Sequence, residues 1–257
     1  MNKVKKSIKE GKLTVGSWVS IGHPRVAEII AQAGFDWLTL DTEHGANDIE
    51  IGERFLQGIQ GTSCVPFIRL PENNSIWIRR SLDAGFVGII VPMVNTRADA
   101  ERAVEACKYP PVGKRGIGFS RANQYGFGLK EYVDNFNEEV VLICQIEHKD
   151  AVKNIDEILS VKGVDGAFMG PYDLSGSMGI LGQFDHPDMR AAMKKVLEAA
   201  KNAGVVAGIH VVPPSVEDVY ERYKEGFRFI ALSLDITVLG HHFRKMFKEL
   251  TPIIGKS

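Results

Sequence analysis

Two carboxylates stand at the ends of two apolar, strand-length segments in the middle of the chain. Glu147 closes the apolar run 140–146, and Asp173 follows the run 165–169 after a short Gly-Pro-Tyr turn. An acidic side chain is costly to bury unless it is paired or binds a metal. If the two runs form neighbouring parallel strands, both carboxylates emerge at one edge of a sheet. That arrangement suits a hard divalent cation such as Mg²⁺, Mn²⁺ or Co²⁺.

A second pair of residues, Asp41 and His44, could transfer protons. They lie three residues apart, directly after the apolar run 37–40. On a turn, the carboxylate can accept the imidazole N–H, which would fix the tautomer and raise the basicity of the outer nitrogen. Such a histidine suits proton transfer near neutral pH. The alternative is a turn histidine beside an aspartate that caps the next helix, and the spacing alone does not decide between the two.

The hydrophobic pattern predicts a scaffold that can bring these distant residues together. The expected strands are 12–21, 37–40, 65–70, 87–93, 140–146, 165–169, 205–211 and 229–234. The expected helices are 26–33, 51–59, 76–82, 96–107, 129–136, 151–159, 187–204, 215–226 and 235–254. Alternating strands and helices imply a parallel sheet, and eight such units in about 250 residues fit a closed (β/α)8 TIM barrel. We therefore expect one α/β domain over residues 1–257.

The alternative architecture is an open doubly wound sheet. It would predict a glycine fingerprint after the first strand, and Gly16 and Gly22 do not provide one. In a closed barrel, the active site lies at the carboxyl ends of the strands. The polar residues that the pattern places at those ends are Asp41, Glu43, His44, Arg69, Gln145, Glu147, Asp173, His210 and Asp235. Each has a structural alternative (Arg69 could simply pair with a neighbouring acid), but their coincidence at one rim favours a functional site.

A Schiff-base lysine is the usual alternative for carbon–carbon chemistry in barrels. No expected strand holds a lysine in its interior or at its carboxyl end. Lys12 opens the first strand, which is the wrong end of the barrel, and Lys149 falls at the expected start of a helix. The sequence therefore favours metal-assisted chemistry over imine chemistry.

The composition excludes several other classes of protein. A net charge of -1 gives no electrostatic signature for nucleic acid or an acidic membrane surface. No apolar run approaches the roughly 20 residues of a membrane span, and residues 1–12 lack the apolar core of a signal peptide. The three cysteines form no C-x-x-C pair, which indicates reduced, packed thiols. We expect a cytoplasmic protein.

A series of motifs then follows the order of a known family over nearly the whole chain. They include Gly16-Ser-Trp18, Leu40-Asp-Thr-Glu-His-Gly45, Phe67-Ile-Arg-Leu-Pro71, Gln145-Ile-Glu147 and the segment 163–175. The chain resembles the HpcH/HpaI aldolase family, the class II pyruvate aldolases of the phosphoenolpyruvate/pyruvate barrel superfamily. The resemblance implies a divalent metal cofactor held by Glu147 and Asp173. It also implies that His44, oriented by Asp41, is the base acting through a metal-bound water.

The resemblance further implies how the substrate is held. Arg69 would steady the enolate oxygen, and Gln145 with the backbone near Gly170 would hold pyruvate. The enolate would then attack an aldehyde, or the reverse reaction would cleave a 4-hydroxy-2-oxo acid. The family commonly assembles as a trimer of dimers through its last helix, which implies a homo-oligomeric interface, a hexamer, for the segment 235–254.

Some residues depart from the family pattern. His148 stands where a small hydroxylated residue is frequent, and His210 ends a strand that usually ends in an aliphatic residue. His210 would face the aldehyde end of the pocket, so we expect a more polar acceptor. Arg121, in the long Gly- and Pro-rich loop 110–128, is a candidate acceptor contact, with a solvent-exposed arginine as the equal alternative.

Two other functions compete with the aldolase. A transferase or decarboxylase that uses phosphoenolpyruvate or pyruvate could occupy the same barrel. A non-catalytic protein that binds a carboxylic acid could keep the same pocket, but the joint presence of Asp41, His44, Arg69, Glu147 and Asp173 argues against it.

Overall fold

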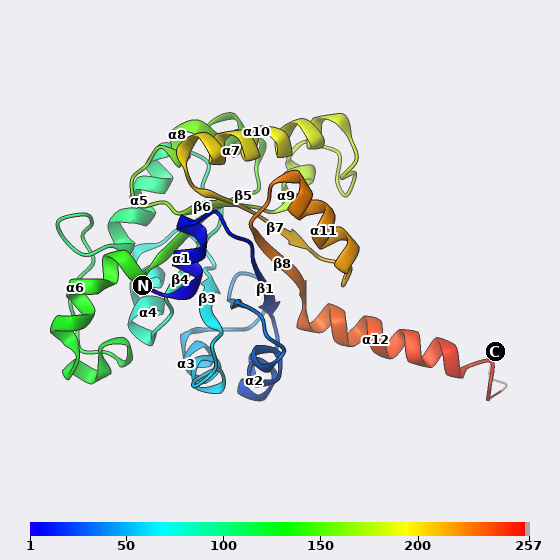
Figure 1. The fold of residues 1–257 in the computed structure, drawn as a ribbon, viewed down its shortest axis with the longest axis horizontal. Helices are drawn as coiled ribbons and strands as arrows, with labels where there is room; N and C mark the ends of the chain where they lie inside the picture. The colour runs from blue at the N-terminus through cyan, green and yellow to red at the C-terminus, as the bar shows by residue number, and fades with distance from the viewer. Residues whose placement is uncertain (255–257) are drawn as a thin grey trace.

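The centre of the molecule is a closed barrel of parallel strands paired in chain order, which confirms the predicted (β/α)8 fold (Figure 1). The computed structural model describes residues 1–254, so residues 255–257 of the predicted domain lie outside the described part. The strands are β1 (Thr14–Val19), β2 (Trp37–Asp41), β3 (Val65–Arg69), β4 (Gly88–Val91), β5 (Val141–Ile146), β6 (Gly166–Met169), β7 (Val206–Val211) and β8 (Phe229–Leu234). Each expected strand is present: β3, β5, β6 and β7 are one residue shorter than predicted, β1 and β4 are shorter by four and three residues, β8 is as predicted and β2 is one residue longer.

Helices surround the barrel and follow most of the predicted segments. They are α1 (Lys3–Lys9), α2 (Pro24–Gln32), α3 (Ile49–Gly58), α4 (Ser75–Ala84), α5 (Arg97–Cys107), the 3-10 helix η1 (Arg121–Gly126), α6 (Leu129–Glu139), α7 (Lys149–Lys153), α8 (Ile155–Leu159), α9 (Pro171–Ser177), α10 (Pro187–Ala203), α11 (Val216–Glu225) and α12 (Asp235–Leu250). Within residues 1–254, no helix is both long and apolar enough to cross a membrane.

Four helical segments differ from the prediction, and one of them is the 3-10 helix η1, which lies inside the predicted loop 110–128. The expected single helix 151–159 is wrong, because the chain leaves helical geometry at Asn154 and forms α7 and α8 on either side. The short helix α1 was not predicted. Helix α9 was not predicted either, and the turn that carries Asp173 is in fact its first turn, with Pro171 as the first helical residue.

The barrel interior is filled by aromatic side chains. Trp18, Trp37, Phe67, Phe168 and Phe229 belong to one buried cluster that runs along the barrel axis. Large rings fit because glycines face them: a Cβ on Gly16 would lie 2.0 Å from Trp37, and one on Gly88 would lie 2.2 Å from Phe67. A second, larger apolar cluster fills the space between strands and helices. The two layers hold the strand ends, and therefore the site, in fixed positions.

Helix α1 closes the amino end of the barrel. Its apolar side chains Val4 and Ile8 join the interior aromatic cluster. Lys5 is buried there because its ammonium donates to the Val140 carbonyl at 2.8 Å and pairs with Asp165. A buried ammonium with these partners is satisfied, so this end is a structural plug rather than a site.

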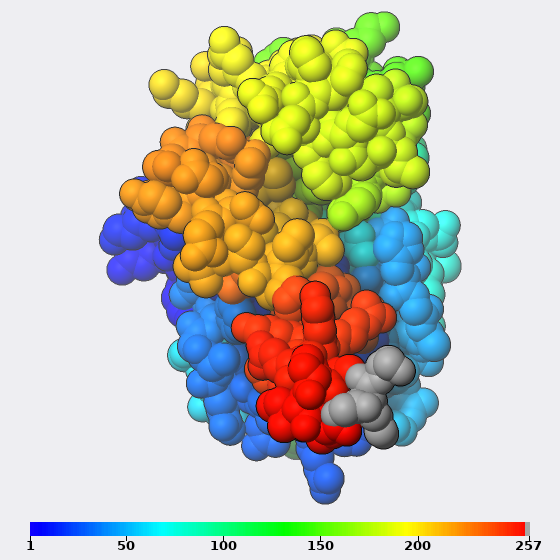
Figure 2. Space-filling model, turned by 90° about the vertical axis from the view of Figure 1, so that its right-hand side faces the viewer, coloured from blue at the N-terminus to red at the C-terminus, as the bar shows by residue number. Residues whose placement is uncertain are grey.

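The last helix behaves differently from the other barrel helices. Figure 1 shows α12 projecting away from the barrel, and Figure 2 looks onto its C-terminal end. Many of its large apolar side chains are exposed to solvent: Ile236, Val238, Leu239, Phe243, Met246, Phe247 and Leu250. The neighbouring barrel helix α11 has no buried residue. Both surfaces are apolar areas of the kind that marks an interface.

Candidate active site

A cavity of about 560 Å³ opens at the carboxyl ends of the strands. The predicted residues that line it are Asp41, His44, Arg69, Gln145, Gly170, Asp173 and His210. Glu147 lies directly behind this lining, since its carboxylate accepts a hydrogen bond from the Gln145 amide. The fold thus brings together residues separated by up to 169 positions in the chain. Arg121 is the one predicted site residue that the structure places elsewhere.

Glu147 is a buried carboxylate held from two sides. The Met93 N–H donates to Oε1 at 2.7 Å, and the Gln145 side-chain amide donates to Oε2. Met93 adopts a left-handed φ of 52°, which is unusual for a residue with a side chain and often accompanies a functional site. Burial raises the pKa of Glu147, the two hydrogen bonds oppose that shift, and the nearby charge of Asp173 adds to it.

Gly170 lets the backbone of the next strand approach Glu147 closely. Strands β5 and β6 pair in register up to Ile146 and Met169, which places Glu147 beside Gly170. A Cβ at position 170 would lie 3.1 Å from the Glu147 Cβ and 3.4 Å from its Oε2. The missing side chain therefore leaves space immediately next to a carboxylate oxygen. Asp173 lies three residues further on, exposed and lining the same cavity.

Asp41 and Arg69 form a two-pronged ion pair across neighbouring strands. The register of β2 and β3 sets the two residues opposite each other. Arg69 donates to both Asp41 oxygens, at 3.0 Å from Nε and 2.7 Å from Nη2. Burial alone would lower the pKa of Arg69, but the hydrogen bonds and charge of Asp41, with the charges of Glu43 and Glu147, raise it. The guanidinium is therefore a fixed, permanent cation in the site.

The expected contact between Asp41 and the imidazole of His44 is absent from the described part of the chain. Asp41 Oδ1 instead accepts the backbone N–H groups of Glu43 (3.1 Å) and His44 (3.3 Å). The alternative, in which Asp41 caps the next helix, is not found either, because the N-cap of α3 is Asp48; Asp41 instead organises the turn and pairs with the neighbouring cation Arg69. A charged guanidinium fork is a stronger partner for a carboxylate than a neutral imidazole. His44 is exposed and lines the cavity.

Glu43 is the most perturbed carboxylate of the site, and it was not among the predicted catalytic residues. Its Oε2 lies 2.9 Å from Arg69 Nη1, but the geometry does not make a hydrogen bond. The contact is therefore an ion pair without a hydrogen bond. Burial raises the pKa of Glu43 to about 7, against the attraction of Arg69 and together with the charges of Glu147, Asp41 and Asp173. Its position just after β2, at the carboxyl end of a barrel strand, is the sequence feature that could have identified it as a site residue.

A stack of rings forms the opposite wall of the cavity. The Trp18 ring lies between Phe168, at 5.0 Å, and His210, at 4.8 Å, with interplanar angles of 27° and 21°. The Arg69 guanidinium lies 5.6 Å from the centre of the Trp18 ring. Two buried polar atoms that line this region, Trp18 Nε1 and Gln145 Oε1, have no hydrogen-bond partner among the described residues. Buried polar atoms without a hydrogen-bond partner indicate a site where a bound ligand supplies the missing partner.

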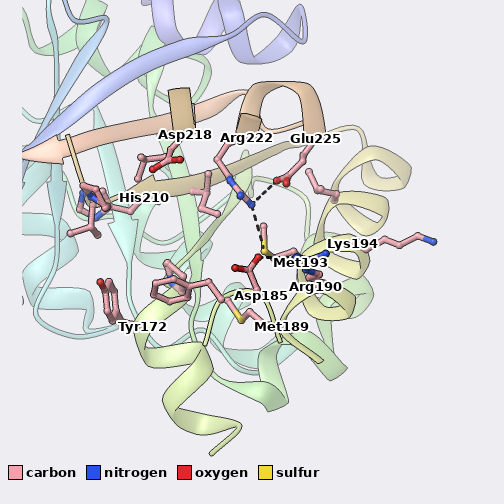
Figure 3. A pocket seen from close by; sticks show the side chains of 17 residues that line it. Tyr172, Asp185, Met189, Arg190, Met193, Lys194, His210, Asp218, Arg222 and Glu225 are labelled. Carbon is pink, nitrogen blue, oxygen red and sulfur yellow. Dashed lines mark hydrogen bonds and ion pairs between the residues drawn. The ribbon is translucent and has the colours of Figure 1, made fainter. Parts of the chain in front are cut away.

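A larger cavity, of about 680 Å³, adjoins the first but does not contain the carboxylates. Figure 3 shows it between α10 and α11, with Arg222 donating to Glu225 and Asp185 beside Arg190. His210 and Tyr172 line both cavities and form the boundary between them. Two of its arginines are paired with acids, Arg222 with Glu225 and Arg190 with Asp185, and none of the predicted carboxylates lines it.

Two other predicted residues have structural roles. Arg121 lies in η1, and its Nη1 donates to the Ala84 carbonyl at 3.1 Å. Ala84 ends α4, just before β4 begins, so Arg121 lies at the amino end of the barrel, away from the cavity. Within one chain, Arg121 therefore does not line the cavity, and the expected contact with the acceptor aldehyde is not made there. Asp235 of the rim accepts the backbone N–H groups of Ser20 (3.0 Å) and Ile21 (2.8 Å) and joins α12 to β1.

The fold and the site together define a (β/α)8-barrel enzyme whose carboxylates and buried arginine meet at the carboxyl ends of the strands. The chain belongs to the HpcH/HpaI aldolase/citrate lyase family, whose sequence profile matches residues 14–242. This confirms the resemblance seen in the motifs, and the chain is an aldolase, a carbon–carbon lyase.

Similar proteins cover nearly the whole chain. The chain is 39% identical over 240 residues to a hydroxypyruvate/pyruvate aldolase of Roseobacter denitrificans, covering 93% of each chain. It is 37% identical over 247 residues to a 5-keto-4-deoxy-D-glucarate aldolase of Escherichia coli, covering 95% of each. A solved HpcH/HpaI aldolase/citrate lyase family protein from Burkholderia cenocepacia superposes with a TM-score of 0.92 at 33% identity, covering 97% of this chain and 99% of that one.

Proposed function

We propose that the chain is a class II pyruvate aldolase that forms or cleaves 4-hydroxy-2-oxo acids through the enolate of pyruvate. The observation that carries the proposal is the meeting of Glu147, Gln145 and Asp173 with Arg69 around one cavity, in a chain that belongs to an aldolase family. Two acids and a cation in a partly enclosed space suit a reaction in which an oxygen gains negative charge.

Aldolases of this class generally depend on a divalent metal, and the residues present fit one. Among the described residues, no three His, Cys, Asp or Glu side chains gather into a complete metal cage. Mg²⁺ and similar ions are often held by only one or two carboxylates, with substrate and water as the other ligands. Glu147 and Asp173 would supply those two carboxylates, and the space beside Gly170 reaches the Glu147 oxygen.

The proposed cofactor is therefore Mg²⁺, Mn²⁺ or Co²⁺. When bound, such an ion supplies positive charge that stabilises the enolate oxygen. The charge of Asp173 is consistent with this role, because it adds to the rise in the pKa of Glu147 and a cation between the two carboxylates relieves that repulsion.

The side chains of the chain have distinct tasks in this scheme. Arg69 keeps its charge and its position through Asp41, and so adds a fixed positive charge near the developing enolate. Gln145 fixes the orientation of Glu147 through its amide N–H and leaves its own carbonyl oxygen without a partner among the described residues. His44 is the candidate base for the C3 proton of pyruvate, because it is the histidine on the exposed side of the cavity.

Removal of the metal tests the proposal most directly. We expect chelation, Glu147→Gln or Asp173→Asn to lower pyruvate release from a 4-hydroxy-2-oxo acid by at least about a hundredfold. The matched control is Asp185→Asn, which removes an exposed acid of the neighbouring cavity. Full activity after thorough chelation contradicts the proposal.

Exchange of the pyruvate C3 protons with D₂O separates an aldolase from a transferase that starts from phosphoenolpyruvate. Enolate formation from pyruvate predicts metal-dependent exchange in the absence of any aldehyde. A transferase that never deprotonates pyruvate predicts none. This assay also examines His44 directly, since His44→Ala should slow the exchange.

We also propose that the chain, as one domain over residues 1–257, works in the cytoplasm as a homo-oligomer, a hexamer built as a trimer of dimers. The apolar faces of α12 and α11 support the oligomer: Phe243 and Phe247 are 66% and 59% exposed, and Tyr220 on α11 is 58% exposed. A second copy would cover both faces with its own α12. Glu substitutions at Phe243 and Phe247 should yield a smaller species in analytical ultracentrifugation; an unchanged sedimentation coefficient contradicts this interface.

A further inference from the structure

His210 is held in a single protonation form by its neighbour on β8. Its Nε2 lies 3.1 Å from the Ser233 carbonyl oxygen. A carbonyl oxygen only accepts hydrogen bonds, so Nε2 carries the proton. Burial lowers the pKa of His210 to about 4, against the hydrogen bond to Ser233. At neutral pH the ring is therefore uncharged, and Nδ1 keeps a free lone pair.

The ring of His210 is also held in place. It stacks on Trp18, which stacks in turn on Phe168. Ser233 adopts a left-handed φ of 55° and is fully buried, with its hydroxyl donating to the Val212 carbonyl at 2.9 Å. An unusual backbone conformation that is fixed in this way persists only when the surroundings impose it. The Ser233 carbonyl is therefore a fixed acceptor; a flip of the imidazole would lose the hydrogen bond, and a tilt of its plane would lose the stack.

The position of His210 assigns it to the acceptor side of the cavity. Gln145, which is proposed to hold pyruvate, belongs to β5, whereas His210 is the penultimate residue of β7 and lines the boundary with the second cavity. No described residue forms a hydrogen bond with its Nδ1. The second reactant thus meets a wall with a lone-pair acceptor in an otherwise aromatic surface.

We propose that His210 determines acceptor specificity by offering Nδ1 as a hydrogen-bond acceptor to a hydroxyl group of the aldehyde. This inference rests on the proposed aldolase function and narrows its substrate class to hydroxylated aldehydes. A hydroxyl group donates to the lone pair, a methyl group cannot, and a carboxylate has only lone pairs of its own. One such hydrogen bond in a partly buried site corresponds to about tenfold in kcat/KM.

A pair of matched aldehydes tests the assignment. Glycolaldehyde and propanal have the same size and differ by a hydroxyl group in place of a methyl group. With pyruvate as donor, wild-type enzyme should favour glycolaldehyde by about tenfold in kcat/KM. His210→Phe keeps a stacked ring and removes both nitrogens, so the ratio should fall to near one. His210→Asn places an amide oxygen close to the position of Nδ1 and should restore part of the preference.

The ratio is taken within each variant, so a general loss of rate cancels. An unchanged ratio in an active His210→Phe enzyme overturns the inference and leaves the aldolase proposal intact. No turnover with either aldehyde, together with no metal-dependent exchange of pyruvate C3 protons in the wild type, overturns the aldolase proposal itself.

A second measurement does not depend on turnover. Nitrogen NMR of the wild-type protein with labelled histidine should show the Nε2–H tautomer for His210 at neutral pH, with His210→Phe providing the assignment. Glycolaldehyde should shift the Nδ1 resonance, and propanal should leave it unchanged. A protonated Nδ1 at neutral pH, or equal shifts with both aldehydes, overturns the inference.

Discussion

Glu43 gives the site a pH-dependent cost in stability that one substitution should remove. Its side chain is 16% exposed and lies 2.9 Å from Arg69. Burial, with the charges of Glu147, Asp41 and Asp173, raises its pKa from 4.5 to about 7, although Arg69 opposes the shift. Between pH 4.5 and 7, the native protein therefore holds a proton that the unfolded chain releases.

The sign and size of the effect follow from this difference. Since the native state binds more protons in that window, the free energy of unfolding falls as pH rises from 4.5 to 7. Each unit of pKa corresponds to 1.36 kcal/mol, so the upper limit is about 3 kcal/mol. Solvent screening at the exposed edge of the side chain reduces this to about 2 kcal/mol. Glu43→Gln removes the titrating group while keeping its shape.

Urea unfolding at pH 5 and pH 8, in the presence of a chelator, measures the effect. Wild-type protein should lose about 2 kcal/mol more than Glu43→Gln between the two pH values. Groups outside the site titrate equally in both proteins, so they cancel in the difference. The control is Glu53→Gln on α3, which removes an exposed carboxylate near the same strand and should follow the wild type. The same pH dependence in all three proteins would refute the reasoning.

Two further predictions concern the residues that position the site. Asp41→Asn leaves Arg69 with one of its two oxygen acceptors, so we expect a loss of about 3 kcal/mol in unfolding free energy and at least tenfold in kcat/KM; unchanged urea midpoints would contradict this. Gly170→Ala places a Cβ 3.1 Å from the Glu147 Cβ, so Mg²⁺ affinity in calorimetric titration should fall about tenfold. Gly176→Ala, whose Cβ meets only Leu181 at 3.6 Å, is the control and should bind Mg²⁺ normally.

The fold was predictable because each barrel strand is a short apolar run between turn residues. The segments that escaped prediction lack such a signal. Helix α1 is rich in lysine and buries only a few side chains against the barrel end. In α9, the start signals Pro171 and Asp173 are followed by Ser and Gly, which are poor helix formers. The break at Asn154 depends on how α7 and α8 pack, which local propensity does not encode.

The sequence predicted which residues gather at the rim of the barrel, but it did not predict which of them form hydrogen bonds or ion pairs with one another. Because the carboxyl ends of barrel strands converge, the sequence alone is enough to group Glu147, Gln145 and His210 at one rim. Arg121 does not follow that rule because it lies in a long loop, where no periodicity fixes direction. Its partner, the Ala84 carbonyl, is 37 residues away in the chain.

The partner of Asp41 shows why contacts need the fold. In the sequence, His44 is three residues away and Arg69 is 28 residues away, so local spacing favours the histidine. In the barrel, the register of β2 and β3 makes Arg69 the direct neighbour. A short-range pattern cannot show a competitor that only strand pairing brings close, and the charged competitor forms the stronger bond.

This pairing has a consequence for the chemistry of the whole site. Arg69 is the one cation that the described residues place among Asp41, Glu43, Glu147 and Asp173, and Asp41 already takes both of its best-aligned donors. The remaining negative charge can be relieved by protonation, as the raised pKa values of Glu43 and Glu147 indicate, or by a bound cation. Protons and divalent cations would therefore compete for the same carboxylates. Under the proposed function, a cavity that is short of positive charge would hold a metal ion more tightly as its carboxylates ionise, and that ion would supply the positive charge an enolate needs.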